Sequence, residues 1–304
     1  MTRQASTVVL TILAVALLLL LLAITALWHA LPVIVSSLLV AYHVIAQLCR
    51  HPLQANWADV VTVAGLLVGA GVLIVLTRFT RRLVQRSATT HERVEAILVR
   101  RTTRWPEVLH AATATMPAAH GWLDIVDCPA PIAFCHGYLR PRICLSTGLI
   151  GLLTPKELAA VLLHERHHRC QRDPLKVLLT GAVVHAFFFV PILAELARRY
   201  DVVKEFAADT AAVGALGVEP LAGALYKVLS CPLAGPDLQT AAVGGLTVTE
   251  QRIDHLLALG SNPVPPLTAS QLLISTATVS TVGTPLIMLS LIHVQPLLHA
   301  CRLA

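Results

Sequence analysis

Charged residues are scarce in this chain: they make up 13% of its 304 residues, whereas hydrophobic residues make up 56%. A soluble domain carries roughly a quarter charged residues. The surplus apolar side chains must therefore face something other than water, and the composition predicts a multi-span membrane protein with one modest polar domain. The net charge of +6 does not indicate direct nucleic-acid binding, because the arginines cluster beside an apolar run, as is typical of membrane topology.

The sequence also lacks the motifs of several enzyme classes. Its seven cysteines form no C-x-x-C pair, which argues against a disulfide framework and favours reduced thiols that face the cytosol. There is no phosphate loop, no dinucleotide fingerprint and no serine nucleophile elbow. We therefore expect neither an ATP-driven degradation machine nor a serine hydrolase.

Long apolar runs predict a membrane-spanning region at about 1–77. The first run, at about 8–28, is long enough to cross a bilayer. It has no A-x-A cleavage site and more apolar sequence follows it, so we interpret it as a retained helix rather than a signal peptide. Two further spans are expected at about 31–48 and 57–77, and a final span with a short tail at 268–304. A two-span alternative, in which 31–48 lies outside the membrane, remains open.

Polar sequence begins with eight arginines between Arg78 and Arg104. By the positive-inside rule, this segment is cytoplasmic. Short strand-like pieces follow at "WLDIV", "PIAFC" and "RICLS", separated by turn residues and surrounded by helical patterns. The predicted fold is thus an α-helical multi-span membrane protein with an α+β cytosolic domain at 78–267.

The stretch "LTPKELAAVLLHERHH" carries its own helix-start signals. Thr154 suits the N-cap, Pro155 the first helical position, and Glu157 the reciprocal partner three residues on. The spacing therefore predicts a helix that begins after Thr154 and carries the histidines.

Two of these histidines, His164 and His168, are four residues apart and so lie on one face of that helix. Glu165 follows the first, which gives H-E-x-x-H: two zinc ligands and a general base for a metal-activated water. His167 is an alternative second ligand. We favour His168, because Glu165 has the position of a general base only when the two ligand histidines are four residues apart. The alternative is a solvated, histidine-rich helix end.

A third ligand is expected from "ARRYDVVKEFAADTAAV". Glu205 on a second helix would complete a His₂Glu zinc site. Asp209, one turn later, is expected to orient a ligand histidine by accepting its other N–H, and Asp173 is a second candidate for that role. The alternative is a pair of solvated acids on a helix face.

The 36 residues between His168 and Glu205 raise a question of topology. They include an apolar run, and a single membrane crossing would put the two residues on opposite sides of the bilayer. The run at 175–190 has 16 residues, about 24 Å as a helix against a hydrocarbon core of about 30 Å, and Pro191 ends it. We therefore expect a membrane-dipping hairpin at about 175–196, or a helix lying against the other spans.

Five stretches in order, "AFCHGYLRPRICLSTGLI", "LTPKELAAVLLHERHHRCQRD", "FFFVP", "EFAADTAA" and "EQRIDHLL", give the chain a family likeness. It resembles the membrane zinc metallopeptidases of the β-lactam sensor–transducer type, the BlaR/MecR antirepressors. The resemblance implies three spans in a bacterial cell membrane, a cytosolic gluzincin-like domain and a fourth span. It also implies one zinc ion per chain, held by His164, His168 and Glu205, with Glu165 as the catalytic base.

The resemblance departs from the family at the C-terminus. Antibiotic sensors of this type carry an extracellular penicillin-binding domain after the last span, and we expect this chain to lack it, because only about ten residues follow the apolar run at 272–294. A related group, the HtpX and CAAX-protease type, shares the H-E-x-x-H…E-x-x-x-D arrangement and is the runner-up.

The sequence therefore predicts an integral-membrane zinc endopeptidase that makes limited cuts in a cytosolic or membrane-proximal protein, such as a transcriptional repressor of the BlaI type. The expected partners are that protein substrate and the lipid bilayer. One alternative is an HtpX-like quality-control or processing peptidase. Another is a non-catalytic, zinc-stabilised signal transducer, which a fourth zinc ligand such as His167 or Cys170 would favour, because structural zinc sites close with four protein ligands.

Two further features keep alternative interpretations. "PIAFC" is either an edge strand that receives substrate by strand addition or an ordinary core strand. Arg140 and Arg142, in "LRPR", are either oxyanion-stabilising residues or turn and surface residues.

Overall fold

The computed structural model describes residues 57–231 apart from 115, 117 and 118, with the backbone alone for 57–68. It also describes Arg252 and scattered positions within 11–21 and 270–281. No helix among these residues is both long enough and apolar enough to cross a membrane. The span predicted at about 31–48, and most residues of those predicted at about 8–28 and 268–304, lie outside the described residues, whereas the segment at 57–77 forms the first half of a helix.

The described residues belong to two compact units. Residues 83–181, 196–231 and Arg252 belong to the first unit, which carries the predicted site, and residues 57–82 and 182–195 belong to the second. The elements in chain order are the helix α2 (Trp57–Leu98), β1 (Arg101–Thr102), α3 (Glu107–Thr113), the 3₁₀ turn η1 (Ala119–Gly121), β2 (Leu123–Val126), β3 (Ala133–His136), β4 (Arg142–Ser146), α4 (Thr147–Leu152), α5 (Pro155–Gln171), α6 (Asp173–Ala186), α7 (Pro191–Leu216) and α8 (Val218–Ser230).

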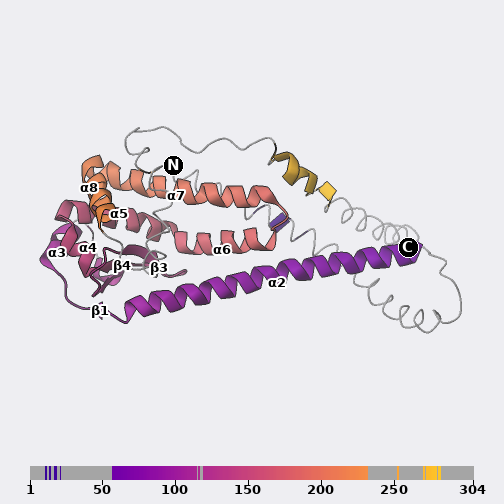
Figure 1. Ribbon diagram of the computed structural model, residues 1–304, viewed down its shortest axis with the longest axis horizontal. Helices are drawn as coiled ribbons and strands as arrows, with labels where there is room; N and C mark the ends of the chain where they lie inside the picture. The colour runs from indigo at the N-terminus through magenta and orange to yellow at the C-terminus, as the bar shows by residue number, and fades with distance from the viewer. Residues whose placement is uncertain are drawn as a thin grey trace, which may run out of the picture. The chain divides into compact units, whose positions relative to one another are not determined.

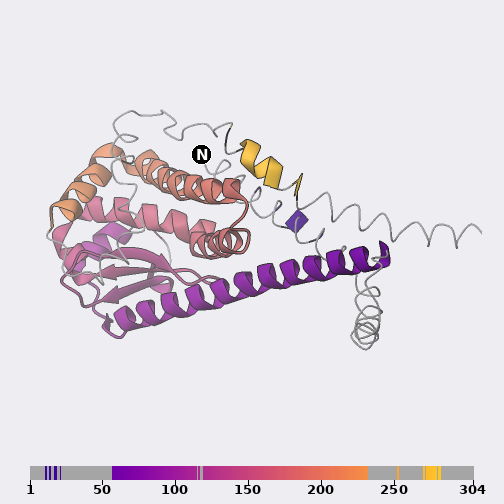
Figure 2. The same cartoon turned by 45° about the vertical axis from the view of Figure 1, so that its right-hand side comes forward.

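The sheet has four short strands in the order β1-β2-β4-β3 (Figure 2). β2 and β4 are parallel, and β1 and β3 run antiparallel to their neighbours. The strand-like pieces predicted from sequence are β2, β3 and β4. β3 lies at one end of this order, so the "PIAFC" segment is an edge strand of the described sheet.

The register of β3 decides which of its backbone groups are available. Ser146 donates its N–H to the carbonyl oxygen of Ile132 at 3.0 Å, and pairing then continues with Ala133 opposite Leu145. Because antiparallel partners alternate between bonded and non-bonded pairs, the backbone groups of Ala133 and Cys135 point away from β4.

A capping box sets the start of helix α5, and a left-handed residue sets its end. At its start, the Thr154 hydroxyl accepts the N–H of Glu157, and the Glu157 carboxylate accepts the N–H of Thr154 at 2.8 Å, so the predicted capping box is present. At its end, Arg172 adopts the left-handed conformation with φ 53°. This reversal lets Asp173, the first residue of α6, lie beside the last turn of α5.

Helix α5 is also the centre of the core in the first unit. It packs against α3, α8, β3 and β4 (Figure 1). Its fully buried Leu158 and Leu162 are four residues apart and join Ile143 and Leu145 of β4 in one hydrophobic cluster. Burying such side chains stabilises the fold by about 1.5–3 kcal/mol each, so the helix that carries the histidines is held rigidly against the sheet.

The chain runs out along α6 and returns along α7 (Figures 1 and 2). The four residues 187–190 join the two helices, and Tyr200 on α7 donates its hydroxyl to Asp173 at the start of α6 at 2.8 Å. This return brings Glu205 alongside His168.

We expect Gly148→Ala to destabilise the protein by about 1–3 kcal/mol or more. Gly148 donates its N–H to the carbonyl of Cys128, and a Cβ atom at this position would collide with the carbonyl oxygen of Pro129. Gly151, in the same helix, is the matched control because a Cβ there would meet nothing within 4 Å. Thermal unfolding followed by circular dichroism should show a lower Tm for Gly148→Ala and an equal or higher Tm for Gly151→Ala. An unchanged Tm in Gly148→Ala would contradict the close approach.

Candidate metal centre

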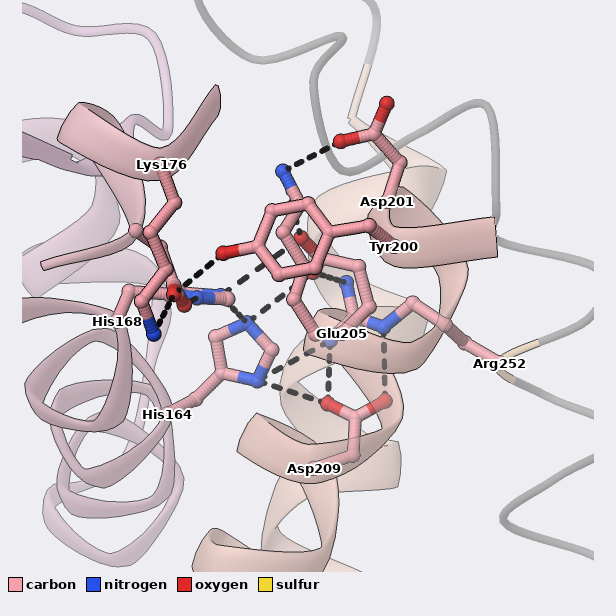
Figure 3. Close-up of polar contacts among 10 residues, drawn as sticks. His164, His168, Lys176, Tyr200, Asp201, Glu205, Asp209 and Arg252 are labelled. Atoms are coloured by element: carbon pink, nitrogen blue, oxygen red, sulfur yellow. Dashed lines mark hydrogen bonds and ion pairs between the residues drawn. The ribbon is translucent and has the colours of Figure 1, made fainter. Parts of the chain in front are cut away.

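Three buried side chains converge at the junction of α5 and α7. His164 and His168 come from α5 and Glu205 from α7, and one ligand atom of each lies within 4.8 Å of the others (Figure 3). The two Nε2 atoms are 3.1 Å apart, and the carboxylate oxygens of Glu205 lie 3.4 Å from His164 and 3.7 Å from His168. All three residues are at most 8% exposed. The structure thus brings together the three ligands expected from sequence.

The other nitrogen of each imidazole contacts a buried acid. Nδ1 of His164 lies 2.8 Å from Asp209, and Nδ1 of His168 lies 2.7 Å from Asp173. A carboxylate at this distance accepts a proton from Nδ1, so Nε2 of each ring is the atom left to bind a metal ion once it is deprotonated. The Nε2 atoms of both imidazoles face the carboxylate of Glu205.

The centre of this cluster favours a positive charge. Burial alone would raise the pKa of Glu205, but the charge of His168 and the hydrogen bonds from both histidines hold it well below its ordinary value. Burial would lower the pKa of His168, yet the charge of Glu205 and the hydrogen bond to Asp173 raise it to about 10. The buried acids around the two imidazoles thus stabilise positive charge at this point, as the binding of a metal ion also requires.

The geometry fits a zinc ion. Tetrahedral zinc with bonds of about 2.0–2.1 Å to nitrogen and oxygen separates its ligand atoms by about 3.3–3.4 Å. The two Nε2 atoms are 3.1 Å apart, and each lies near a different oxygen of Glu205, at 3.4 and 3.7 Å, so the spacing of the donor atoms is close to that value. A set of two imidazoles and one carboxylate is also the donor set of catalytic zinc sites that keep a position for water.

Two residues behind the acids were not predicted from sequence. Arg252 donates from Nε and Nη2 to the two oxygens of Asp209, at 2.8 and 2.6 Å, and Tyr200 donates to Asp173 (Figure 3). Burial would raise the pKa of Asp209, but the hydrogen bonds from His164 and Arg252 lower it to about 2. The stretch "EQRIDHLL" had been noted for its family likeness, but no spacing rule places Arg252 beside an acid 43 residues away.

The ligands open onto a cavity of about 600 Å³ within the first unit. Glu165, which is half-buried, lines this cavity together with the three ligands, as does Cys135 of the edge strand β3. Much of the remaining wall is apolar and comes from α5 and α8, including Val161, Leu221, Leu225 and Val228. The predicted base, the ligands and the edge strand therefore line one cavity.

Other residues considered from sequence lie outside this group. Among the described residues, the cluster of possible ligands holds His164, His168 and Glu205, and includes neither His167 nor the exposed Cys170.

Arg142 forms a two-pronged ion pair with Asp124, at 2.7 and 2.8 Å. That acid is buried on β2 and also contacts His136 and Arg101. The guanidinium of Arg142 therefore joins β2 to β4 and does not line the cavity, while Arg140 is exposed in the turn before β4.

Comparison with known proteins places these residues in a family. The family described as BlaR1 peptidase M56 matches residues 34–220. Protease HtpX of Psychrobacter sp. (strain PRwf-1) is 35% identical over 81 residues, which are 25% of this chain and 27% of that relative, so the match spans about a quarter of the relative's length. No solved structure matches. Because the family match covers more than half of the chain and contains the three ligands and Glu165, the chain belongs to the BlaR1 peptidase M56 family.

Proposed function

We propose that the protein is a membrane-embedded zinc endopeptidase that makes limited cuts in a cytosolic or membrane-proximal protein. The observation that carries this proposal is the convergence of His164, His168 and Glu205 on one point of a cavity that Glu165 also lines. The membership of a peptidase family supports hydrolysis of peptide bonds. The apolar runs outside the described residues and the arginine-rich segment after them support a membrane setting.

His164, His168 and Glu205 would hold the zinc ion. When bound, zinc supplies Lewis-acid polarisation of the scissile carbonyl and lowers the pKa of a water molecule. Glu165 takes one proton from the water as its oxygen attacks the carbonyl carbon. It then gives that proton to the amide nitrogen as the C–N bond breaks, so that a carboxylic acid and an amine leave. Asp209 and Asp173 keep the two imidazoles oriented through Nδ1–H.

The edge strand β3 suggests how a substrate is held. The backbone groups of Ala133 and Cys135 point away from β4, and Phe134 and Cys135 line the same cavity as the ligands. An extended peptide that adds to this edge would pair with these backbone groups. Its scissile bond would then lie between the edge strand and α5. This arrangement requires an extended substrate segment, such as a flexible loop or linker of the target protein.

The substrate that we propose is a transcriptional repressor of the antibiotic-response type, on the strength of the family. A cavity of about 600 Å³ holds only a short segment at a time, which suits one or a few cuts better than bulk degradation. The similarity to Protease HtpX covers the smaller part of both chains, so it supports peptidase chemistry equally for a quality-control role.

Cells that carry Glu165→Gln in place of the wild-type chain should accumulate one specific cytosolic repressor in its uncut form, and the genes it controls should fall silent. The reason is that the variant keeps the metal ligands but loses the base. Quantitative proteomics with labelling of new N-termini, during cell-wall stress, would identify the cut protein. Unchanged repressor levels together with accumulating misfolded membrane proteins would replace this proposal with the quality-control function. No difference at all would argue for the non-catalytic transducer.

A further inference from the structure

The side chain of Arg252 is built into the metal centre although it comes from far along the chain. It is 6% exposed, and its Nε and Nη2 atoms donate to both oxygens of Asp209 at 2.8 and 2.6 Å (Figure 3). A two-pronged contact of this kind fixes the plane of the carboxylate as well as its position. Arg252 lies beyond residues 34–220, so the family match does not include it.

Asp209 is the link between this guanidinium and the metal site. Its Oδ1 atom lies 2.8 Å from Nδ1 of His164 and 2.6 Å from Nη2 of Arg252, and its side chain is fully buried. A buried carboxylate without a cationic partner is costly. The two hydrogen bonds from Arg252 hold the carboxylate of Asp209 turned toward His164, where it accepts the proton on Nδ1 of that ring.

Charge explains why an arginine can be tolerated here. The Nη1 atom of Arg252 is only 3.7 Å from the carboxylate of Glu205, and an isolated cation so close would oppose a bound metal ion. The ion pair with Asp209 is neutral as a whole. It can therefore orient His164 without adding net charge to the centre.

We propose that Arg252 is a positioning residue of the metal centre: through Asp209 it fixes the Nδ1–H tautomer and the ring plane of His164, and so presents Nε2 to zinc. The inference rests on the proposed zinc site. On the other side of the centre, Tyr200 donates one hydroxyl to Asp173 at 2.8 Å and Lys176 lies 3.6 Å from the same oxygen, so neither makes a two-pronged contact. The stronger restraint thus acts on His164.

The test measures zinc affinity of the full-length protein, purified in detergent, by competition with a chromophoric chelator. Arg252→Met should raise the Kd for zinc by about tenfold or more, in the range measured for residues that orient metal ligands. Arg252→Lys keeps the positive charge but cannot donate two parallel hydrogen bonds to Asp209, so its Kd for zinc should lie between those of Arg252→Met and wild type. In cobalt-substituted protein, the visible absorption bands of Arg252→Met should shift because a ligand has changed orientation.

Arg142→Met is the matched control. It removes an equivalent two-pronged contact with a buried acid, Asp124, away from the metal ligands. It should lower the Tm but leave the Kd for zinc unchanged. The double variant Asp209→Asn with Arg252→Met should bind zinc no more weakly than Asp209→Asn alone, because Arg252 acts on His164 only through Asp209.

The outcomes separate the two proposals. Three results would overturn the positioning role and leave the proposed function standing. They are wild-type zinc affinity in Arg252→Met, an equal loss of affinity in Arg142→Met, and additive losses in the double variant. If wild-type protein binds no zinc tightly, the proposed function fails, and this inference fails with it.

Discussion

Replacing Glu165 by glutamine is expected to lower kcat for peptide cleavage by about 10²–10⁴-fold while zinc stays bound. Glu165 follows a ligand histidine directly and lines the cavity, but it is not among the three residues whose ligand atoms converge. The amide of glutamine has nearly the same size and cannot accept the proton from water. The variant should therefore separate catalysis from metal binding.

The measurement pairs single-turnover cleavage of a quenched fluorescent peptide with the zinc content of the same sample by mass spectrometry. Glu219→Gln is the matched control, because Glu219 is exposed in the first turn of α8 and is not among the cavity-lining residues. It should leave both quantities at wild-type values. Wild-type turnover in Glu165→Gln would rule out Glu165 as the base, and loss of zinc would mean that it is a ligand instead.

The features that could be read from the sequence are those set by short-range periodicity. Thr154, Pro155 and Glu157 define the start of α5 through local hydrogen bonds, and the structure has that capping box. Once the helix is fixed, its 3.6-residue period places His164 and His168 on one face without any tertiary information. The strand pieces were similarly found because apolar runs bounded by turn residues mark buried strands.

The features that escaped prediction depend on contacts between distant segments. Arg252 reaches Asp209 across 43 residues, and Tyr200 reaches Asp173 across 27. Neither distance leaves a periodic signal. The sequence does hold a clue to the role of Arg142. Asp124 lies within the apolar strand "WLDIV", and burying its carboxylate is costly without a cationic partner.

The left-handed Arg172 belongs to the same group of features that sequence patterns miss. Asp173 could be nominated as a partner of His168 from its proximity in sequence, yet a continuing helix would carry a residue five positions on around the helix axis, away from the histidine. The reversal at Arg172, with φ 53°, ends α5 and brings the carboxylate of Asp173 to 2.7 Å from Nδ1. Few non-glycine residues adopt this conformation, so neither the sequence nor its spacing marks it.

Removing the carboxylate of Glu205 is expected to weaken zinc binding more than any change behind the ligands. Glu205→Ala takes away one of three protein ligands and leaves two imidazoles, so we expect the Kd to rise by more than about 100-fold, the upper end of the range for residues that only orient ligands. Asp209→Asn should raise it by about 10–100-fold, because His164 remains but loses its ionised acceptor.

The order of these losses tests the site independently of catalysis. Zinc content after dialysis against a weak chelator should fall in the order wild type, Asp209→Asn, Glu205→Ala, with Glu219→Ala as the control that removes an exposed acid. Equal zinc content in Glu205→Ala and wild type would place the third ligand elsewhere. A larger loss in Asp209→Asn than in Glu205→Ala would mean that Asp209 binds the metal directly, which its full burial between His164 and Arg252 argues against.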